Sequence, residues 1–344
     1  MTKTPRKTMK SSTAIAPSNL AFLKYWGKKD SNLRIPCNNS ISVNLGNATT
    51  ITNVNFSPDL EKDIVIVNDS EHDATSSFTV RVSKHLDRLR AIADQKSKAI
   101  VKTKNSFPES VGIASSASGF AALTVAAADA LELNLSEKEL SIFARLGSGS
   151  ACRSIPDGFV EWIAGDSNNT SFAKQIAPPD HWDISIVTVI VSKDAKKLTS
   201  TSGHELAVAS PFFKSRMETI DIHLNRVREA ILNKDFEQFG REVEMEAISL
   251  HSIAMTSPFT ANGWNSGAYY WTPDTMELIR AVQEWRSSGL EVYFTLDAGP
   301  TVHLICRRED EGKIEKAVRN VEKNIPLRSW DIAINRPAVG ARVQ

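Results

Sequence analysis

Apolar and polar residues alternate along several short stretches near the N-terminus. The pattern is clear over Ser40–Leu45 and Thr49–Phe56, and an apolar run follows at Asp63–Asn68. A period of two places apolar side chains on one face of an extended chain, as in a half-buried β-strand. Ala16–Asp30 also begins as a strand and ends as a polar, cationic turn. This part of the chain therefore predicts a sheet.

Apolar positions spaced three or four residues apart predict helices in the same half. Thr79–Asp94 has this spacing, and Phe120–Leu131 is rich in Ala, Leu and Val with no helix-breaking residue. Ser136–Leu146 opens with Ser136 and has Glu139 three residues later, the pattern of a capping box. Helices are therefore expected beside the sheet.

The second half has a different order of elements. A strand at Phe159–Ile163 and a long buried strand at Asp183–Ser192 flank the polar stretch Ala164–Trp182, which we interpret as a linker. Helices are then expected at Pro211–Leu232, Phe236–Ala254, Pro273–Ser287 and Glu309–Asn324, and strands at Glu291–Leu296 and Val302–Cys306. This order favours an α+β domain with an antiparallel sheet.

Composition narrows the class of protein. The 344 residues are 41% hydrophobic and carry a formal net charge of +1, so no bulk field favours nucleic acid or a membrane surface. No apolar run reaches the ~20 residues of a membrane-spanning helix. The three cysteines, Cys37, Cys152 and Cys306, are too scattered for a disulfide framework and suit free thiols in a reducing cytoplasm. Met1–Ser12 is basic and Ser/Thr-rich without an apolar core, so we expect a disordered tail rather than a secretory signal.

Small residues dominate the segment Pro108–Ser118, which leads into the predicted helix at Phe120–Leu131. With so little side-chain bulk, backbone N–H groups and the helix dipole can point together at a phosphate. The spacing matches neither the dinucleotide glycine pattern nor a P-loop. The alternative is a Ser-rich helix cap in a tight turn.

Three further segments place charged residues beside small ones. These are Lys24-Tyr-Trp-Gly-Lys28, Gly147-Ser-Gly-Ser-Ala-Cys-Arg153 and Asp297-Ala-Gly-Pro300. Two lysines, an arginine and a lone aspartate beside small residues suit a site that binds an anionic substrate together with ATP.

The small-residue loop resembles the ATP phosphate loop of the GHMP kinases (galactose, homoserine, mevalonate and phosphomevalonate kinases). The three charged motifs together resemble one branch, the mevalonate diphosphate decarboxylases, and the likeness runs in order from about Ala14 to Ile305. It implies a two-lobed α+β GHMP kinase fold, with a lobe like ribosomal protein S5 domain 2 and a ferredoxin-like lobe. We therefore expect a disordered tail over 1–12, an ATP-binding lobe over 13–182, a C-terminal lobe over 183–344, and a homodimer.

The resemblance also implies the reaction. ATP phosphorylates the 3-hydroxyl of mevalonate 5-diphosphate, and loss of phosphate and CO2 then gives isopentenyl diphosphate. ATP and Mg²⁺ are the implied cofactors. The residues expected to bind ATP are Asn105, Ser106, Gly112, Ala114, Ser115 and Ser116. Asn105 and Ser106 would lie on the adenine side, and Ser116 is a candidate metal ligand, although the sequence does not single out one serine.

Three residues carry the expected chemistry. Asp297, rigid in a Gly-Pro turn, would deprotonate or orient the 3-hydroxyl, and Lys24 would offset its charge and that of the transferred phosphoryl group. Arg153 would clamp the C1 carboxylate through a bidentate fork. The alternatives are an Asx-turn for Asp297, an exposed strand-end lysine and an arginine in a surface ion pair.

Four other residues are expected to bind the substrate. Lys28 would reach the terminal 5-phosphate with help from the Tyr25 hydroxyl, and Ser148 and Ser150 would add contacts beside Arg153. A solvated lysine turn and a packing tyrosine are the competing interpretations. Thr201 stands where bacterial members of the family often carry an arginine that grips the diphosphate.

Because Thr201 stands in place of that arginine, other functions stay open. The first is a sister decarboxylase acting on mevalonate 5-phosphate or 3,5-bisphosphate. The others are a GHMP small-molecule kinase that stops after phosphorylation, and a catalytically silent sensor on the same fold. The complete set of Lys24, Arg153 and Asp297 argues against the last two functions.

Overall fold

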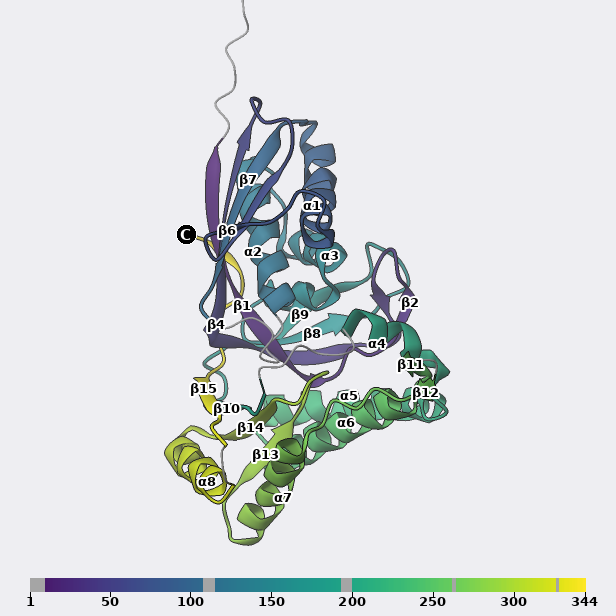
Figure 1. Ribbon diagram of the computed structural model, residues 1–344, viewed down its shortest axis with the longest axis vertical. Coiled ribbons are helices and arrows are strands. Elements are labelled where there is room, and N and C mark those ends of the chain that lie inside the picture. Colours follow the sequence, from purple (N-terminus) through teal and green to yellow (C-terminus); the bar gives the residue numbers. More distant parts are fainter. Residues whose placement is uncertain (1–9, 108–114, 193–199, 262–263, 326–327) are drawn as a thin grey trace, which may run out of the picture.

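The computed structural model describes residues 10–107, 115–192, 200–261, 264–325 and 328–344. Figure 1 shows two parts stacked along the long axis of the molecule, each a sheet with helices packed against it. The predicted mixture of helices and strands is confirmed.

The first part contains an eight-stranded sheet among the described residues, with the order β16-β1-β4-β7-β5-β6 and with β8 and β9 branching from β4. Its strands are β1 (Ser11–Leu23), β4 (Ser40–Ser57), β5 (Ile64–Val67), β6 (Ser70–Glu71), β7 (Lys98–Asn105), β8 (Phe159–Ile163), β9 (Phe172–Ala177) and β16 (Arg342–Val343). A separate ribbon pairs β2 (Lys28–Asp30) with β3 (Ile35–Pro36). The β5–β7 pair is parallel and the other pairs are antiparallel.

Three helices pack beside this sheet: α1 (Ser77–Ala93), α2 (Ser115–Ala130) and α3 (Glu137–Gly147) (Figure 1). The predicted capping box opens α3, because Ser136 Oγ accepts from the Glu139 N–H and the Glu139 carboxylate accepts from the Ser136 N–H. Alanine-rich α2 is buried on most of its surface, which suits small side chains in a close helix–sheet contact. The 3-10 helix η1 (Gly149–Ser154) follows α3.

The second part contains the predicted antiparallel sheet, with the order β13-β14-β10-β15. Its strands are β10 (Ile184–Ile190), β13 (Val292–Thr295), β14 (Val302–Arg307) and β15 (Asp331–Asn335), with a hairpin of β11 (Phe259–Ala261) and β12 (Trp264–Ser266) outside the sheet. Its helices are α4 (Ser200–Leu206), α5 (Phe213–Asn233), α6 (Phe236–Thr256), α7 (Pro273–Ser287) and α8 (Glu311–Lys323), with short 3-10 turns η2 (Ala207–Ala209) and η3 (Arg308–Asp310).

A shared hydrophobic core joins the two parts. It contains Leu20 and Phe22 from β1 together with Leu224 from α5 and Phe239 from α6. The rings of Phe22 and Phe239 meet edge to face with centroids 4.7 Å apart. Because the end of β1 belongs to this core, the residue that follows it is held against the second part.

Several sequence predictions were wrong in detail. The predicted linker contains β9, which pairs with β8. The two strands predicted at Ser40–Leu45 and Thr49–Phe56 are one strand, β4, whose register against β1 shifts at Pro17/Ser18, so that Gly46, Asn47 and Ala48 are accommodated without ending the strand. Strands β7 and β15, the short strands β2, β3, β6, β11, β12 and β16, and helix α4 were not predicted.

The predicted boundaries of the tail and of the lobes stay predictions. Ser11 and Ser12 of the proposed tail belong to β1, and residues 1–9 lie outside the described residues. The chain also returns to the first part at its end, where β16 pairs with β1. No helix in the described part of the chain is both long and apolar enough to cross a membrane.

Candidate active site

The structure brings Lys24 and Asp297 together from opposite ends of the chain. Lys24 follows β1 and its side chain is only 1% exposed, and its Nζ lies 2.9 Å from Asp297 Oδ1. The same ammonium donates to the backbone carbonyl of Ala21. Asp297 occupies the turn between β13 and β14, and its side chain is 27% exposed. The carboxylate is therefore held by a buried cation while one side stays accessible to a substrate.

Arg153 is a buried cation held by neutral groups. It lies in η1 with 3% exposure and donates to Ser40 Oγ at 2.7 Å, Ser42 Oγ at 3.1 Å and Asn19 Oδ1 at 3.1 Å. No ion pair of Arg153 with a carboxylate occurs in the described part of the chain. Burial lowers the pKa of Arg153, and the charge of Asp297 acts in the opposite direction. The guanidinium can thus receive an anionic ligand without releasing a protein carboxylate.

Asn19 on β1 orients Arg153, and sequence reasoning missed it. Its side-chain oxygen accepts from Arg153, and its amide nitrogen donates to Ser154 Oγ at 2.8 Å and to the Ser150 carbonyl at 3.0 Å. The available signal was a polar residue in the apolar end of a buried strand. Of the two predicted serine contacts, Ser150 is half-buried and Ser148 is buried.

Ser148 directly precedes η1, which carries Arg153, and connects it with the start of α2. Its hydroxyl donates to Ser116 Oγ at 3.2 Å. Ser115 and Ser116 are the first residues of α2, where backbone N–H groups are free of helical partners. The predicted phosphate-binding residues Gly112 and Ala114 lie outside the described residues.

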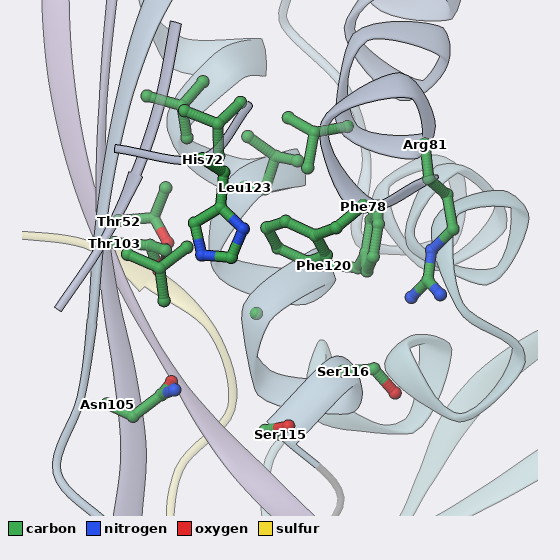
Figure 2. A pocket seen from close by; sticks show the side chains of 15 residues that line it. Thr52, His72, Phe78, Arg81, Thr103, Asn105, Ser115, Ser116, Phe120 and Leu123 are labelled. Carbon is green, nitrogen blue, oxygen red and sulfur yellow. Dashed lines mark hydrogen bonds between the residues drawn. The ribbon is translucent and has the colours of Figure 1, made fainter. Parts of the chain in front are cut away.

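A cavity of about 250 Å³ lies beside the start of α2 (Figure 2). Asn105, Ser115 and Ser116 line it, together with apolar residues from β5, β7 and α2. A cavity with polar groups at one end and apolar walls elsewhere suits a nucleotide. Ser106 does not line this cavity. Its hydroxyl accepts from the Thr49 N–H at 2.9 Å and donates to the Asn47 carbonyl at 3.1 Å, and its role in binding ATP stays a prediction.

Arg81 from α1 also lines the cavity, and sequence reasoning missed it (Figure 2). Its guanidinium carbon lies 4.4 Å from the centroid of the Phe120 ring. Its Nε is buried and has no hydrogen-bond partner in the described part of the chain. Burial and the charge of Arg34 lower the pKa of Arg81 to about 10, which keeps it cationic at neutral pH. A cation at this position suits a phosphate chain.

The two residues expected at the 5-phosphates have partners within the protein. Lys28 Nζ lies 3.8 Å from Glu205 Oε1, and burial lowers the pKa of Lys28. The Tyr25 ring stacks on His204 with centroids 3.9 Å apart. Burial raises the pKa of Tyr25, so its hydroxyl is a hydrogen-bond donor at neutral pH.

Two family models match almost the whole chain. Residues 16–173 match the diphosphomevalonate decarboxylase-like N-terminal domain, and residues 186–335 match the mevalonate 5-diphosphate decarboxylase C-terminal domain. The diphosphomevalonate decarboxylase of Saccharomyces cerevisiae is 34% identical over 94% of this chain and 84% of its own length. The chain belongs to the diphosphomevalonate decarboxylase family.

Two further relatives of this decarboxylase family bear on the substrate. The phosphomevalonate decarboxylase of Haloferax volcanii is 32% identical over 89% of this chain and 91% of its own length. A solved structure called MDDEF, in complex with MVAPP, AMPPCP and magnesium, is 32% identical. It has a TM-score of 0.87 and covers 97% of this chain and 98% of that chain.

Buried neutral histidines should make this decarboxylase-family chain acid-sensitive. Burial, aided by Arg88 and Arg81, lowers the pKa of His85 to about 3, and burial with Lys24 does the same for His251. Unfolded histidine binds a proton below a pH of about 6.5, whereas these folded rings do so only near their lowered pKa values. Stability is therefore complete above the unfolded pKa and falls as the pH drops below it.

At pH 5 each such histidine is expected to lower the free energy of unfolding by about 2 kcal/mol relative to pH 7. Urea unfolding at pH 7 and pH 5 would measure the fall. In His85→Gln, which cannot titrate, the difference between the two pH values should shrink by about that amount. Identical pH dependence in this variant and the unchanged protein would contradict the prediction.

Proposed function

We propose that this protein catalyses the ATP-dependent decarboxylation of mevalonate 5-diphosphate to isopentenyl diphosphate. The observation that carries the proposal is Arg153, a buried guanidinium without a carboxylate partner among the described residues, within electrostatic reach of Asp297. Family membership supplies the substrate class. A kinase that stops after phosphorylation has no need for a second fixed cation reserved for a carboxylate.

Each residue has a step in this proposal. Asp297 orients the 3-hydroxyl and takes its proton as the oxygen attacks the γ-phosphoryl group of ATP, and Lys24 balances the charge. The bond between the γ-phosphorus and the bridging oxygen of the β-phosphate breaks, and ADP leaves. Arg153 then holds the C1 carboxylate. The C1–C2 bond breaks, its electron pair forms the C2–C3 double bond, and the phosphate on C3 leaves with the C3–O electrons. CO2, inorganic phosphate and isopentenyl diphosphate result.

The residues present fit a magnesium nucleotide. The cavity beside α2 has the polar and apolar walls that a nucleotide requires, and Arg81 and Ser116 line it. When bound, magnesium neutralises charge on the phosphate groups. The Ser116 hydroxyl, an oxygen ligand of the kind that Mg²⁺ prefers, would complement phosphate oxygens. Among the described residues, no group of three acidic, cysteine or histidine side chains is arranged to hold a metal ion.

Product analysis tests the proposal. The purified protein is incubated with ATP, magnesium and, separately, mevalonate, its 5-phosphate and its 5-diphosphate, while ADP and CO2 are both measured. Equal release of ADP and CO2 from the 5-diphosphate alone is the expected result. ADP without CO2 would make the protein a kinase and would remove the role given to Arg153.

A second candidate is decarboxylation of mevalonate 5-phosphate. The observation that favours it is Glu205, whose carboxylate faces Lys28 at 3.8 Å and adds negative charge where a second phosphate would lie. The Haloferax volcanii relative carries the corresponding name. ADP and CO2 released together from the 5-phosphate, and not from the 5-diphosphate, would establish this candidate.

We also propose a cytoplasmic homodimer. The cytoplasmic location is supported by the absence of disulfides, since Cys37, Cys152 and Cys306 are all free thiols. Dimer formation is supported by exposed apolar side chains on α5 and α6, among them Ile222 and Ile248. Light scattering coupled to size-exclusion chromatography would distinguish a monomer from a dimer.

A further inference from the structure

The backbone of Lys24 is held by a buried ion pair from the second part of the molecule. Lys24 lies just beyond the end of β1, where the ladder of sheet hydrogen bonds stops. Its N–H donates to Glu246 Oε1 at 3.0 Å, and its carbonyl accepts from Arg216 Nη2 at 3.1 Å. Arg216 and Glu246 also pair directly with each other, and both are buried.

Asn38 completes this arrangement. Its amide nitrogen donates to the Lys24 carbonyl at 3.0 Å, and its side-chain oxygen accepts from Arg216 Nη1 at 3.1 Å. Both polar groups of Lys24's main chain are thus satisfied by side chains rather than by strand pairing. Buried backbone groups without partners are costly, so this network defines where the Lys24 peptide can lie.

The same helix also positions the approach to Asp297. Glu246 lies on α6, and Glu244, two residues earlier, accepts from the Phe294 N–H of β13 at 3.1 Å and pairs with Arg286. Strand β13 leads directly into the Asp297 turn. Helix α6 is therefore a common support for the lysine and for the carboxylate that it meets.

We propose that Arg216 and Glu246 are positioning residues for the reaction, because they fix the Lys24 peptide and so aim its ammonium at Asp297. An ion pair serves this purpose better than a single hydrogen bond. Its two partners come from α5 and α6, and together they contact both the N–H and the carbonyl of one residue. The inference rests on the proposed function, in which Lys24 and Asp297 act together.

The chain offers a matched control on the same two helices. Glu242, one turn before Glu246 on α6, pairs with His223 and Arg226 of α5 and does not contact Lys24. Glu246→Gln and Glu242→Gln each remove one buried carboxylate charge between α5 and α6. Their comparison separates loss of helix packing from loss of Lys24 positioning.

Steady-state kinetics is the first measurement. Glu246→Gln is expected to lower kcat about tenfold or more, because misplacement of a reacting group is costly, while the KM for ATP stays within about twofold. Glu242→Gln should keep kcat within about twofold. Equal kcat values in the two variants would overturn the proposal.

Two milder variants keep the proposal testable if Glu246→Gln does not fold. Asn38→Ala removes the hydrogen bonds of Asn38 with the Lys24 carbonyl and with Arg216 and leaves the ion pair intact, and Arg216→Lys keeps the charge but loses the fork. Each should lower kcat by about threefold or more in a protein that remains folded, as its circular dichroism spectrum would show. Unchanged kcat in both would also overturn the proposal.

A readout without turnover separates this inference from the proposed function. The side-chain NMR signal of Lys24, assigned with Lys24→Arg, should move in Glu246→Gln and stay in place in Glu242→Gln. If the unchanged protein released neither ADP nor CO2 but the signal moved as expected, the function would fail and the positioning of Lys24 would stand. A signal that moved equally in both variants would remove the positioning role.

Discussion

Asp297→Asn is expected to lower kcat by about 10³-fold or more, while the KM for ATP stays close to that of the unchanged protein. The Asp297 carboxylate lies 2.9 Å from the Lys24 ammonium, in a turn fixed between two buried strands. Asparagine keeps the shape and can still accept a hydrogen bond. It cannot take a proton from the substrate hydroxyl, and it leaves the buried ammonium without a counter-charge. Rates of CO2 release and a separate measurement of ATP binding would test both parts.

The control for this prediction is Glu291→Gln. Glu291 precedes β13 and forms an exposed ion pair with Arg307, so its loss changes the charge near the same strand without entering the site. Exposed ion pairs contribute little, and kcat should stay within about twofold. A rate for Asp297→Asn as high as that for Glu291→Gln would exclude Asp297 from the mechanism.

The residues that sequence reasoning found share a local signature. Lys24, Arg153 and Asp297 each belong to a short motif that also contains glycine, and Lys24 and Asp297 follow apolar runs predicted as strands, so the chemistry and the backbone setting are visible within a few positions. Their meeting depends on the fold. The structure brings Lys24 to Asp297 across 273 positions of sequence, and their roles in the reaction stay predictions.

The residues that sequence reasoning missed act through distant parts of the chain. Asn19 orients Arg153 across 134 positions, and Glu246 holds Lys24 across 222. Within their own segments these are a polar residue in a strand and one of several acidic residues in a helix. Arg81 likewise belongs to an ordinary amphipathic helix, and only the packing of α1 beside α2 brings it to the nucleotide cavity. Such contacts leave no periodic pattern along the sequence, so sequence analysis does not find them.

Helices and strands show the same contrast between elements that a local pattern predicts and elements that depend on a distant partner. Helices with a strong apolar stripe or a capping box, such as α3, were found within a few residues of their ends. The missed strands β7 and β9 are six to eight residues long and show no regular alternation, since β7 reads Lys-Ala-Ile-Val-Lys-Thr-Lys-Asn and β9 reads Phe-Ala-Lys-Gln-Ile-Ala. A short segment without alternation resembles a polar connection until its partner strand is known, and pairing with β4 and β8 is what stabilises these two.

Arg153→Met is expected to raise the KM for the mevalonate substrate by about 10- to 100-fold, with the KM for ATP within about twofold. The Arg153 guanidinium is fixed by neutral acceptors on Ser40, Ser42 and Asn19, so its charge is available to a carboxylate. Methionine fills the volume without offering a charged hydrogen bond. Arg153→Lys should recover part of the loss, because it restores the charge but not the fork.

Arg145→Met provides the matched control for Arg153→Met. Arg145 is also a buried arginine, eight residues earlier, but it donates to the Ser171 carbonyl and to Asn168 and so stabilises a loop. Its loss should lower the thermal midpoint without favouring one substrate over the other. Steady-state kinetics with each substrate varied in turn separates the two arginines. If Arg153→Met weakened ATP and the mevalonate substrate equally, as a structural arginine would, its charge would be part of the scaffold, and the case for decarboxylation over simple phosphoryl transfer would lose its main support.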